Sequence, residues 1–272
     1  MKALPHGDAA RALVAHLLRS AGLEARGLTG ERLDHGKSGD LVYRIDAPMV
    51  AFAKIADPER RVSGEELARE IAVLRWFDGR CGAPRPMWSG RVDGRPALLM
   101  EALPGAPLHQ LADATAEAGV AAAIQALARL HMLPIEDCPF DARLETKLGE
   151  ARSRVAAGEV DTNDFDPNRA GRSAEDILNE VEGSLPSAQD LVVTHGDACW
   201  PNFVVSPGGE AGLIDLGRAG VADRYQDLAL FIRSGQRNLP CADVCELIER
   251  FYPLGAIDQR KVEFFQLLDE LF

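Results

Sequence analysis

The residues best suited to chemistry are concentrated in one stretch of the chain, residues 191–217. An apolar run ends shortly before Asp197, Asn202 follows five residues later, and a second apolar run leads into Asp215. The sequence Ser-Pro-Gly-Gly at 206–209 is typical of a tight turn. We therefore predict strand, loop, strand, turn and strand. This hairpin would bring Asn202 and Asp215 close together, with Asp197 on the loop beside them.

Two carboxylates and an amide at such a junction suit phosphoryl transfer. That reaction needs a carboxylate to accept or orient the acceptor hydroxyl, and oxygen ligands for the magnesium ions that bridge the phosphates. Protein kinases carry the pattern H-R-D-x-x-x-x-N followed by D-F-G. Here the corresponding residues are His195-Gly196-Asp197, Asn202 and Asp215-Leu216-Gly217. An acidic hairpin with an Asx turn would explain His-Gly-Asp alone, but it fits the type, order and spacing of the whole set less well.

An earlier lysine is a candidate for holding phosphates. Residues 41–45 and 50–55 are predicted to form strands, and Lys54 lies inside the second. Lys54 could simply reach solvent from an edge strand. The preceding loop, 34–40, contains Gly-Lys-Ser but lacks the glycine spacing and the following helix of a P-loop. We expect instead a hairpin loop whose backbone amides and Ser38 hydroxyl approach the phosphates.

A phosphate-binding lysine needs an acid to hold it in place. Residues 63–77 are predicted to form a helix that begins with Ser63 as its N-cap. Glu70 lies beside the buried face of this helix and is the expected partner of Lys54. Glu66 is the second possibility.

A small antiparallel sheet is predicted to continue after this helix. Residues 88–90 and 95–100 are expected to pair around Asp93-Gly94, which strongly favours a hairpin turn. The segment 101–105 interrupts the pattern and could be a hinge whose backbone contacts adenine. Met100 would then stand at the back of the adenine pocket.

Most of the remaining chain is predicted to be helical. Residues 8–22 favour an amphipathic packing helix. A later helix ends at His131, which we interpret as a C-terminal capping residue rather than a catalytic one. Residues 134–190 are expected to form helices joined by an acidic loop. Asp223 is predicted to cap a further helix, and Asp227 within it could brace the loop that carries the catalytic carboxylate.

Two further groups of acids leave alternatives open. Glu159, Asp161 and Asp164 are interpreted as a solvated face in the first instance and as a cation-binding lid in the second. At the C-terminus, Asp269 and Glu270 precede the terminal carboxylate. Either a packed amphipathic helix or an anionic wall fits this end of the chain.

Composition narrows the class of protein. The chain has 272 residues, of which 46% are hydrophobic and 26% charged, which is typical of a globular protein of one or two domains. A net charge of −12 argues against nucleic-acid binding and suits a cationic substrate. Five scattered cysteines, with no zinc-site spacing, indicate reduced thiols and a cytoplasmic location. We see no membrane-spanning segment, and we expect a monomer.

These residues together resemble the aminoglycoside phosphotransferases, above all the 3′-phosphotransferases that act on kanamycin and neomycin. The similarity extends from about residue 31 to the C-terminus. The matching segments are 53–55 (AKI), 138–140 (CPF), 193–199 (VTHGDAC), 213–218 (LIDLGR), 220–229 (GVADRYQDLA) and 267–272 (LLDELF). The resemblance implies an α+β, protein-kinase-like fold of two lobes. A small lobe with an antiparallel sheet, residues 1–102, would bind the nucleotide, and a larger, mostly helical lobe, 103–272, would hold the catalytic loop, the metal site and the aminoglycoside.

The resemblance also implies individual roles. Asp197 would be the catalytic base or the residue that orients the acceptor, Asn202 and Asp215 the Mg²⁺ ligands, and Lys54 with Glu70 the pair that anchors the ATP phosphates. Further ATP contacts would come from Ser38, Phe52, Met100, Glu101, Leu103 and Ile214. The aminoglycoside would contact Glu159, Asp161, Asp164, Arg218, Asp269, Glu270 and Phe272. The sequence departs from the family pattern at Trp200-Pro201 and in its first thirty residues.

The leading hypothesis is therefore ATP-dependent phosphorylation of an aminoglycoside, at the 3′-hydroxyl, with antibiotic resistance as the result. One alternative keeps the fold and changes the substrate to streptomycin at 3″ or to another small molecule. A second alternative is a catalytically inactive kinase fold that acts as a binding module. The joint presence of Lys54, Asp197, Asn202 and Asp215 argues against the inactive module.

Overall fold

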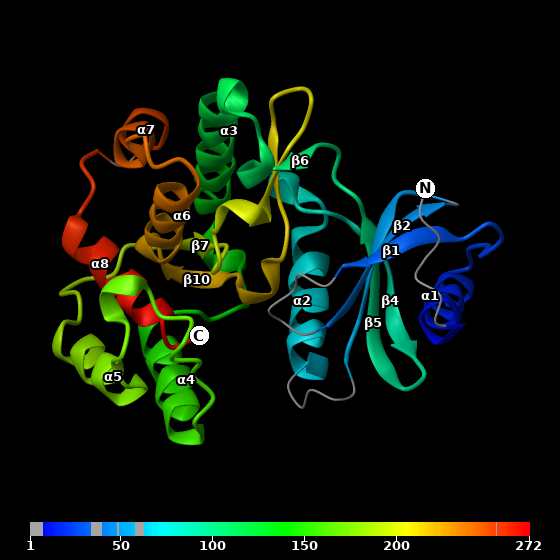
Figure 1. Ribbon diagram of the computed structural model, residues 1–272, viewed down its shortest axis with the longest axis horizontal. Helices are drawn as coiled ribbons and strands as arrows, with labels where there is room; N and C mark the ends of the chain where they lie inside the picture. Colours follow the sequence, from blue (N-terminus) through cyan, green and yellow to red (C-terminus); the bar gives the residue numbers. More distant parts are fainter. Residues whose placement is uncertain (1–7, 34–39, 48, 58–62, 254) are drawn as a thin grey trace. The chain divides into compact units, whose positions relative to one another are not determined.

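The structure is a computed structural model that describes residues 8–33, 40–47, 49–57, 63–253 and 255–272 (Figure 1). The chain divides into two compact units. The first, called here the N-terminal unit, comprises Met1–Pro104 and Gly212–Gly217, and the second, the helical unit, comprises Gly105–Ala211 and Arg218–Phe272. We expected a single division after residue 102. In the structure the short segment 212–217 belongs to the N-terminal unit.

The N-terminal unit contains a five-stranded antiparallel sheet in the order β1-β2-β3-β5-β4. Its strands are β1 (Thr29–Leu33), β2 (Leu41–Ala47), β3 (Ala51–Ile55), β4 (Pro86–Val92) and β5 (Arg95–Glu101). The turn between β4 and β5 lies at the predicted dipeptide, where Asp93 and Gly94 have φ angles of 49° and 79°. Both central residues of a type I′ hairpin turn require positive φ, so the predicted hairpin is confirmed.

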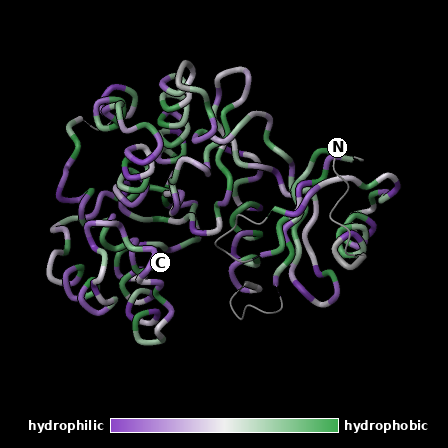
Figure 2. The backbone as a smooth tube through the Cα atoms, in the orientation of Figure 1, coloured by the Kyte–Doolittle hydropathy of each residue, from purple (hydrophilic) through white to green (hydrophobic). Residues whose placement is uncertain are grey.

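Two helices accompany this sheet, α1 (Asp8–Ser20) and α2 (Ser63–Phe77). The predicted apolar face of α1 is buried, and Leu17 and Leu18 share one hydrophobic core with Tyr43, Ile45 and Leu99 of the sheet. Figure 2 shows hydrophobic residues along the strands and on α1. The bounds of α2 match the prediction, while the side chain of Ser63 and the loop with Ser38 lie outside the described residues.

The helical unit is built around α6, whose first eight residues are all buried. Its helices are α3 (Asp113–His131), α4 (Leu144–Ala157), α5 (Ala174–Gly183), α6 (Tyr225–Asn238), α7 (Val244–Phe251) and α8 (Gln259–Asp269). Strand β7 (Leu191–Thr194) pairs antiparallel with β10 (Gly220–Asp223), and β6 (Ala106–Pro107) pairs with β8 (Phe203–Val205). Strand β9 (Ala211–Leu213) follows β8 across the turn that the sequence predicted. The predicted combination of an antiparallel N-terminal sheet and a mostly helical remainder is confirmed.

Short 3₁₀ segments connect these elements. They are Arg80–Gly82, Leu108–Gln110, Ile135–Asp137, Pro167–Arg169, Trp200–Asn202 and Leu216–Arg218. None of the helices in the described ranges combines the length and the apolar character needed to cross a bilayer.

Two predictions about helix ends need correction. Helix α3 does end at His131, but its C-cap is Met132, and the His131 side chain is buried among other side chains instead of capping carbonyl groups. Helix α6 begins at Tyr225 with Arg224 as its N-cap. Asp223 lies one residue earlier and accepts a hydrogen bond from the Tyr225 amide at 3.0 Å.

Candidate active site

In the N-terminal unit, a buried ammonium group is held by two carboxylates. Lys54 on β3 donates to Glu70 Oε1 at 2.7 Å and to Oε2 at 2.9 Å, and Glu70 comes from α2. Its third hydrogen bond goes to Asp215 Oδ1 at 2.9 Å. A lysine ammonium has three N–H donors, so this arrangement satisfies it. The predicted pairing with Glu70 is present, and Glu66 is exposed on α2.

The electrostatics keep Lys54 charged. The side chains of Lys54 and Glu70 are 8% and 5% exposed. Burial alone would lower the pKa of Lys54, but the nearby Glu70 and Asp215 carboxylates outweigh it and raise that pKa above its ordinary value. A charged ammonium fixed by a neighbouring helix is the arrangement that phosphoryl transfer uses to bind nucleotide phosphates.

Asp215 occupies a strained backbone position next to this pair. Its φ is +60°, a left-handed conformation that few residues other than glycine adopt. The segment is tied to α2, because Arg69 Nε donates to the Gly217 carbonyl at 2.9 Å. The Asp215 side chain is 47% exposed. The carboxylate therefore faces Lys54 on one side and remains accessible to a ligand.

The other predicted nucleotide contacts lie around the same sheet. Phe52 on β3 is paired in register with Met100 on β5, and Met100 is buried. Glu101 ends β5, and its amide donates to the Arg85 carbonyl at 3.0 Å. Leu103 and Ile214 are partly buried in the same unit. Their contact with adenine stays a prediction.

In the helical unit, a buried carboxylate supports the loop after β7. Asp227 has no exposed surface and accepts hydrogen bonds from the amides of His195 at 2.6 Å and Gly196 at 2.8 Å. Gly196 has φ +83°, and a Cβ there would lie 2.2 Å from the Arg218 carbonyl oxygen. The predicted brace by Asp227 is therefore confirmed, and only glycine fits at 196.

Asp197 follows this braced turn and is itself fixed locally. Its amide hydrogen-bonds with His195 Nδ1 at 3.2 Å, and its carbonyl accepts from Asn202 Nδ2 at 2.9 Å. Because the amide nitrogen of Asn202 is used in this way, its amide oxygen points elsewhere. Asn202 and Asp215 belong to different units, so their predicted proximity stays a prediction.

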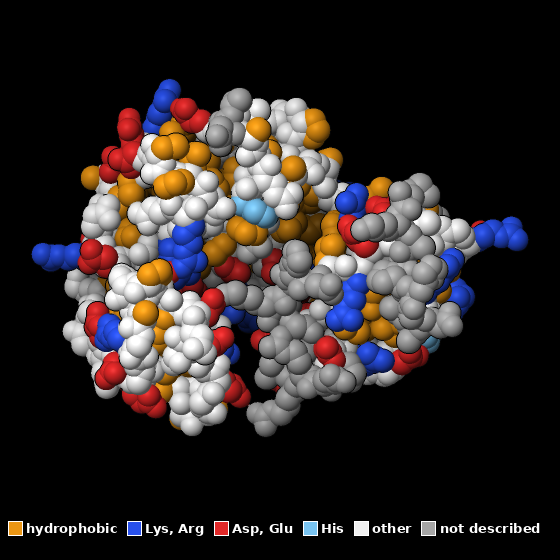
Figure 3. Space-filling model, viewed as in Figure 1, with side chains coloured by type: hydrophobic (Ala, Val, Ile, Leu, Met, Phe, Trp, Pro, Cys, Tyr) orange, Lys and Arg blue, Asp and Glu red, His pale blue; other side chains and the backbone are white. Residues whose placement is uncertain are grey.

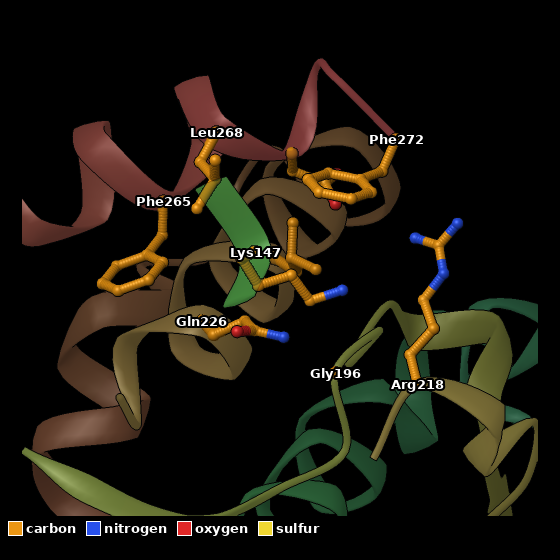
Figure 4. A pocket seen from close by; sticks show the side chains of 9 residues that line it. Lys147, Gly196, Arg218, Gln226, Phe265, Leu268 and Phe272 are labelled. Atoms are coloured by element: carbon orange, nitrogen blue, oxygen red, sulfur yellow. The ribbon is translucent and has the colours of Figure 1, made fainter. Parts of the chain in front are cut away.

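A pocket beside Gly196 is lined by three of the predicted substrate-binding residues, Arg218, Asp269 and Phe272. Figure 4 shows Phe265, Leu268 and Phe272 along one wall, Lys147 and Gln226 below them, and Arg218 projecting from the other side. Lys147 was not predicted. Its ammonium lies 4.5 Å from the centre of the Phe272 ring, and a lone lysine in a helix gives no local signal of such a contact.

The acids near the C-terminus are already paired with arginines. Asp269, at the end of α8, accepts from Arg233 and is 24% exposed. Glu270 is 3% exposed and accepts from Arg169 Nη1 at 2.6 Å and from the Asp166 amide at 3.1 Å. This end of the chain is thus a packed helix with paired acids, and the substrate contacts of Asp269 and Glu270 stay a prediction.

The predicted acidic loop lies next to the C-terminal residue. Arg154 donates to the carbonyls of Leu271 at 2.8 Å and Glu159 at 3.2 Å, and to a terminal carboxylate oxygen of Phe272 at 3.2 Å. Glu159, Asp161 and Asp164 are all exposed. On the face seen in Figure 3, red acidic and blue basic side chains are interspersed over the helical unit. A role of these three acids as a cation-binding lid stays a prediction.

Comparison with known sequences identifies the family of this chain. The pattern of the phosphotransferase enzyme family matches residues 29–261. An aminoglycoside 3′-phosphotransferase of Streptomyces fradiae is 37% identical over 252 residues, which cover 88% of this chain and 94% of that protein. A streptomycin 3″-kinase of Streptomyces griseus is 33% identical over 211 residues, covering 74% of this chain and 75% of that protein.

Solved structures give the same result. An aminoglycoside 3′-phosphotransferase of type VIII superposes with a TM-score of 0.81 at 33% identity, over 94% of this chain and all of that one. An aminoglycoside phosphotransferase of Streptomyces rimosus, solved with ADP and streptomycin, gives a TM-score of 0.80 at 25% identity, over 96% and 97% of the two chains. These likenesses confirm the predicted kinase-like fold class.

Proposed function

The chain belongs to the phosphotransferase enzyme family, and we propose that it transfers phosphate from ATP to the 3′-hydroxyl of an aminoglycoside antibiotic and so confers resistance. The observation that carries this proposal is the 37% identity to a 3′-phosphotransferase over 88% of the chain. The two braced sites, Lys54 with its carboxylates and the Asp197 loop, supply the chemistry.

Lys54 anchors the nucleotide in this mechanism. Glu70 holds its ammonium with two short hydrogen bonds, so the charge is oriented before ATP arrives. Preorganised charge of this kind stabilises a transition state without having to reorganise during the reaction. Phe52 and Met100 would pack against adenine, and the backbone at Glu101 and Leu103 would read its edge.

Asp197 acts on the acceptor. The acceptor oxygen forms a new bond to the γ-phosphorus while the bond from that phosphorus to the β,γ-bridging oxygen breaks, and ADP leaves with the bond's electrons. The hydroxyl proton passes to the Asp197 carboxylate. Asp227 contributes by fixing the backbone before Asp197, because a catalytic group that is misplaced by 1 Å can cost about a hundredfold in rate.

Magnesium fits the donor set of this chain. Asp215 would supply a carboxylate oxygen and Asn202 its amide oxygen, because the hydrogen bond from Asn202 to the Asp197 carbonyl uses only the amide nitrogen. These are the hard oxygen ligands that Mg²⁺ prefers, usually completed by phosphates and water. When bound, the ion would neutralise phosphate charge. Within the described residues no cluster of three or more His, Cys, Asp or Glu side chains forms a metal site.

The pocket beside Gly196 is the proposed place of the aminoglycoside. Asp269, the Phe272 carboxylate and the exposed acids at 159–164 would meet its amines, with Arg218 near the acceptor. We also propose that the enzyme is a cytoplasmic monomer that binds no nucleic acid, in keeping with its negative charge and scattered cysteines.

The deciding experiment measures ADP release by the purified protein with Mg-ATP and three drugs. Kanamycin has the 3′-hydroxyl, tobramycin lacks it, and streptomycin tests the 3″ position. Turnover with kanamycin but not tobramycin is expected. The variant D197A should fold normally and lose most turnover, and near wild-type activity in this variant would remove Asp197 from the mechanism.

Phosphorylation of streptomycin is the second candidate. It is favoured by the relatives from S. griseus and S. rimosus, one named a streptomycin 3″-kinase and one solved with streptomycin. Turnover with streptomycin alone would keep the roles of Lys54 and Asp197 and move the acceptor to 3″. Nucleotide binding without turnover on any of the three drugs would instead favour an inactive binding module.

A further inference from the structure

A buried series of hydrogen-bonded side chains connects the loop that carries Asp197 to the C-terminal ends of α3 and α7 in the helical unit. Asp227, which binds the amides of His195 and Gly196, also bonds to His131 Nε2 at 2.9 Å. The other ring nitrogen of His131, Nδ1, lies 2.5 Å from the hydroxyl of Tyr252. The series thus joins the last residue of α3, the first turn of α6 and the residue after α7.

All members of this series are removed from water. His131 is 8% exposed, Tyr252 3%, and Asp227 has no exposed surface. Buried polar groups of this kind are costly unless each is satisfied. The rings of His131 and Tyr252 also pack edge to face, with centres 5.6 Å apart, so their relative position is fixed by packing as well as by the hydrogen bond.

The available donors and acceptors determine which group donates in each hydrogen bond of this series. Arg224 Nη1 donates to the Tyr252 hydroxyl oxygen at 3.2 Å, and Arg has no acceptor. The proton of the Tyr252 hydroxyl is then directed to His131 Nδ1, and the proton of His131 lies on Nε2, where it is donated to Asp227. Burial raises the pKa of Tyr252 to about 12, so the hydroxyl keeps its proton at neutral pH.

We propose that His131 and Tyr252 are positioning residues for the reaction, acting through Asp227 on the backbone that carries Asp197. The inference rests on the proposed phosphotransfer and extends it to two residues that do not touch the reacting atoms. Asp227 accepts three hydrogen bonds, two from the loop and one from His131. Loss of the His131 bond frees this carboxylate to rotate, and the two loop amides move with it.

The first test compares two replacements of His131. In H131L the donor to Asp227 is gone, and we expect kcat to fall by about ten- to a hundredfold, with the KM values for ATP and aminoglycoside within about twofold of wild type. In H131Q the side-chain amide presents an N–H near the position of Nε2. This variant should recover most of the lost kcat, whereas a merely space-filling role would make leucine and glutamine equally poor.

The second test removes a single hydroxyl group. It keeps the inference testable if H131L fails to fold. Y252F keeps the ring and deletes the donor to His131, so kcat should fall about three- to tenfold. The matched control is Y225F. Tyr225 is also buried in the helical unit, but its hydroxyl accepts from the Asp258 amide at 2.8 Å, so Y225F should keep wild-type kcat.

A third measurement does not depend on activity. Hydrogen exchange of the His195 and Gly196 amides should speed up at least about tenfold in Y252F and H131L, and not in Y225F. If wild type turns over no aminoglycoside, the proposed function fails and exchange alone decides the inference. If the wild type is active, any one of four results would overturn the inference. These are an unchanged kcat in Y252F, unchanged exchange in Y252F, a KM increase that matches the kcat loss, and a kcat in H131Q no higher than in H131L.

Discussion

Replacing Glu70 alone should lower the free energy of unfolding more than replacing both Glu70 and Lys54. In E70L the Lys54 ammonium stays in a site where the side chain is 8% exposed, and it loses two of its three hydrogen bonds. Breaking a buried ion pair costs about 3–5 kcal/mol. Asp215 retains one bond, but its side chain is half-exposed and water screens it. We therefore expect a loss of about 3 kcal/mol in the free energy of unfolding.

The double variant K54M/E70L should recover most of this loss. It replaces a buried charge pair by apolar side chains of similar volume, an exchange that is often neutral or stabilising. Turnover should nevertheless stay absent, because nothing replaces the ammonium that is proposed to anchor the phosphates. Stability and activity would thus separate in one pair of residues.

The single variant K54M adds a pH dependence with a defined sign. Burial already raises the pKa of Glu70 above its ordinary 4.5, and without Lys54 the attraction that opposes this shift is gone. A group whose pKa is raised in the folded state stabilises that state while it is protonated, and the benefit is lost as pH rises through the folded pKa. K54M should be more stable at pH 5 than at pH 8, relative to K54M/E70L at the same two values.

Unfolding of the N-terminal unit can be followed separately within the full-length protein. Trp76 and Trp88 lie in that unit, so urea unfolding followed by their fluorescence in a W200F background reports on it. ADP release gives the activity, and E66L, at an exposed glutamate of the same helix, is the matched control. Equal stability of E70L and K54M/E70L, or turnover by the double variant, would refute the reasoning.

Two further predictions concern the helical unit. A Cβ at Gly235 would lie 2.7 Å from Val244 Cγ2 and 2.9 Å from Trp200 Cζ2, so G235A should lose about 1–3 kcal/mol of stability and less in a W200L background; additive losses in denaturant unfolding would contradict this. Burial and the Asp197 carboxylate raise the pKa of the Cys199 thiol, whereas Cys241 is exposed. A thiol reagent at pH 8 should label Cys241 in the native protein much faster than the partly buried Cys199, and equal labelling rates in mass spectrometry would contradict this.

The parts of the fold that sequence predicted are those with local signals. The β4–β5 hairpin follows from one dipeptide whose residues tolerate positive φ, Asp93-Gly94. The bounds of α2 follow from its apolar spacing, and its Glu70 was identified because Lys54 in an apolar strand needs an acid. The Asp197 loop followed from residue order and spacing within a single short stretch. In each case the information lies within a few residues of the structure it determines.

The misassigned and missed residues depend on distant partners instead. His131 stands 96 residues from Asp227 and 121 from Tyr252, and a histidine near a proline at a helix end is also typical of a cap. Lys147 contacts Phe272 at the other end of the helical unit's sequence. Only the packing of α3, α6 and α7 around one another brings such side chains together, and no periodicity within a single helix encodes it.

The net charge of the whole chain does not describe the charge that lines the pocket beside Gly196, the proposed substrate pocket. The chain carries −12 overall, yet the pocket is lined by the cations Lys147 and Arg218, by Asp269, already paired with Arg233, and by Phe272 with its terminal carboxylate. An amine that reaches Asp269 exchanges one ion pair for another, and such an exchange at a partly exposed site yields little net free energy. For the proposed aminoglycoside substrate, selectivity would therefore come from the geometry with which this pocket places one hydroxyl, while the overall negative charge would speed the approach of a polycation.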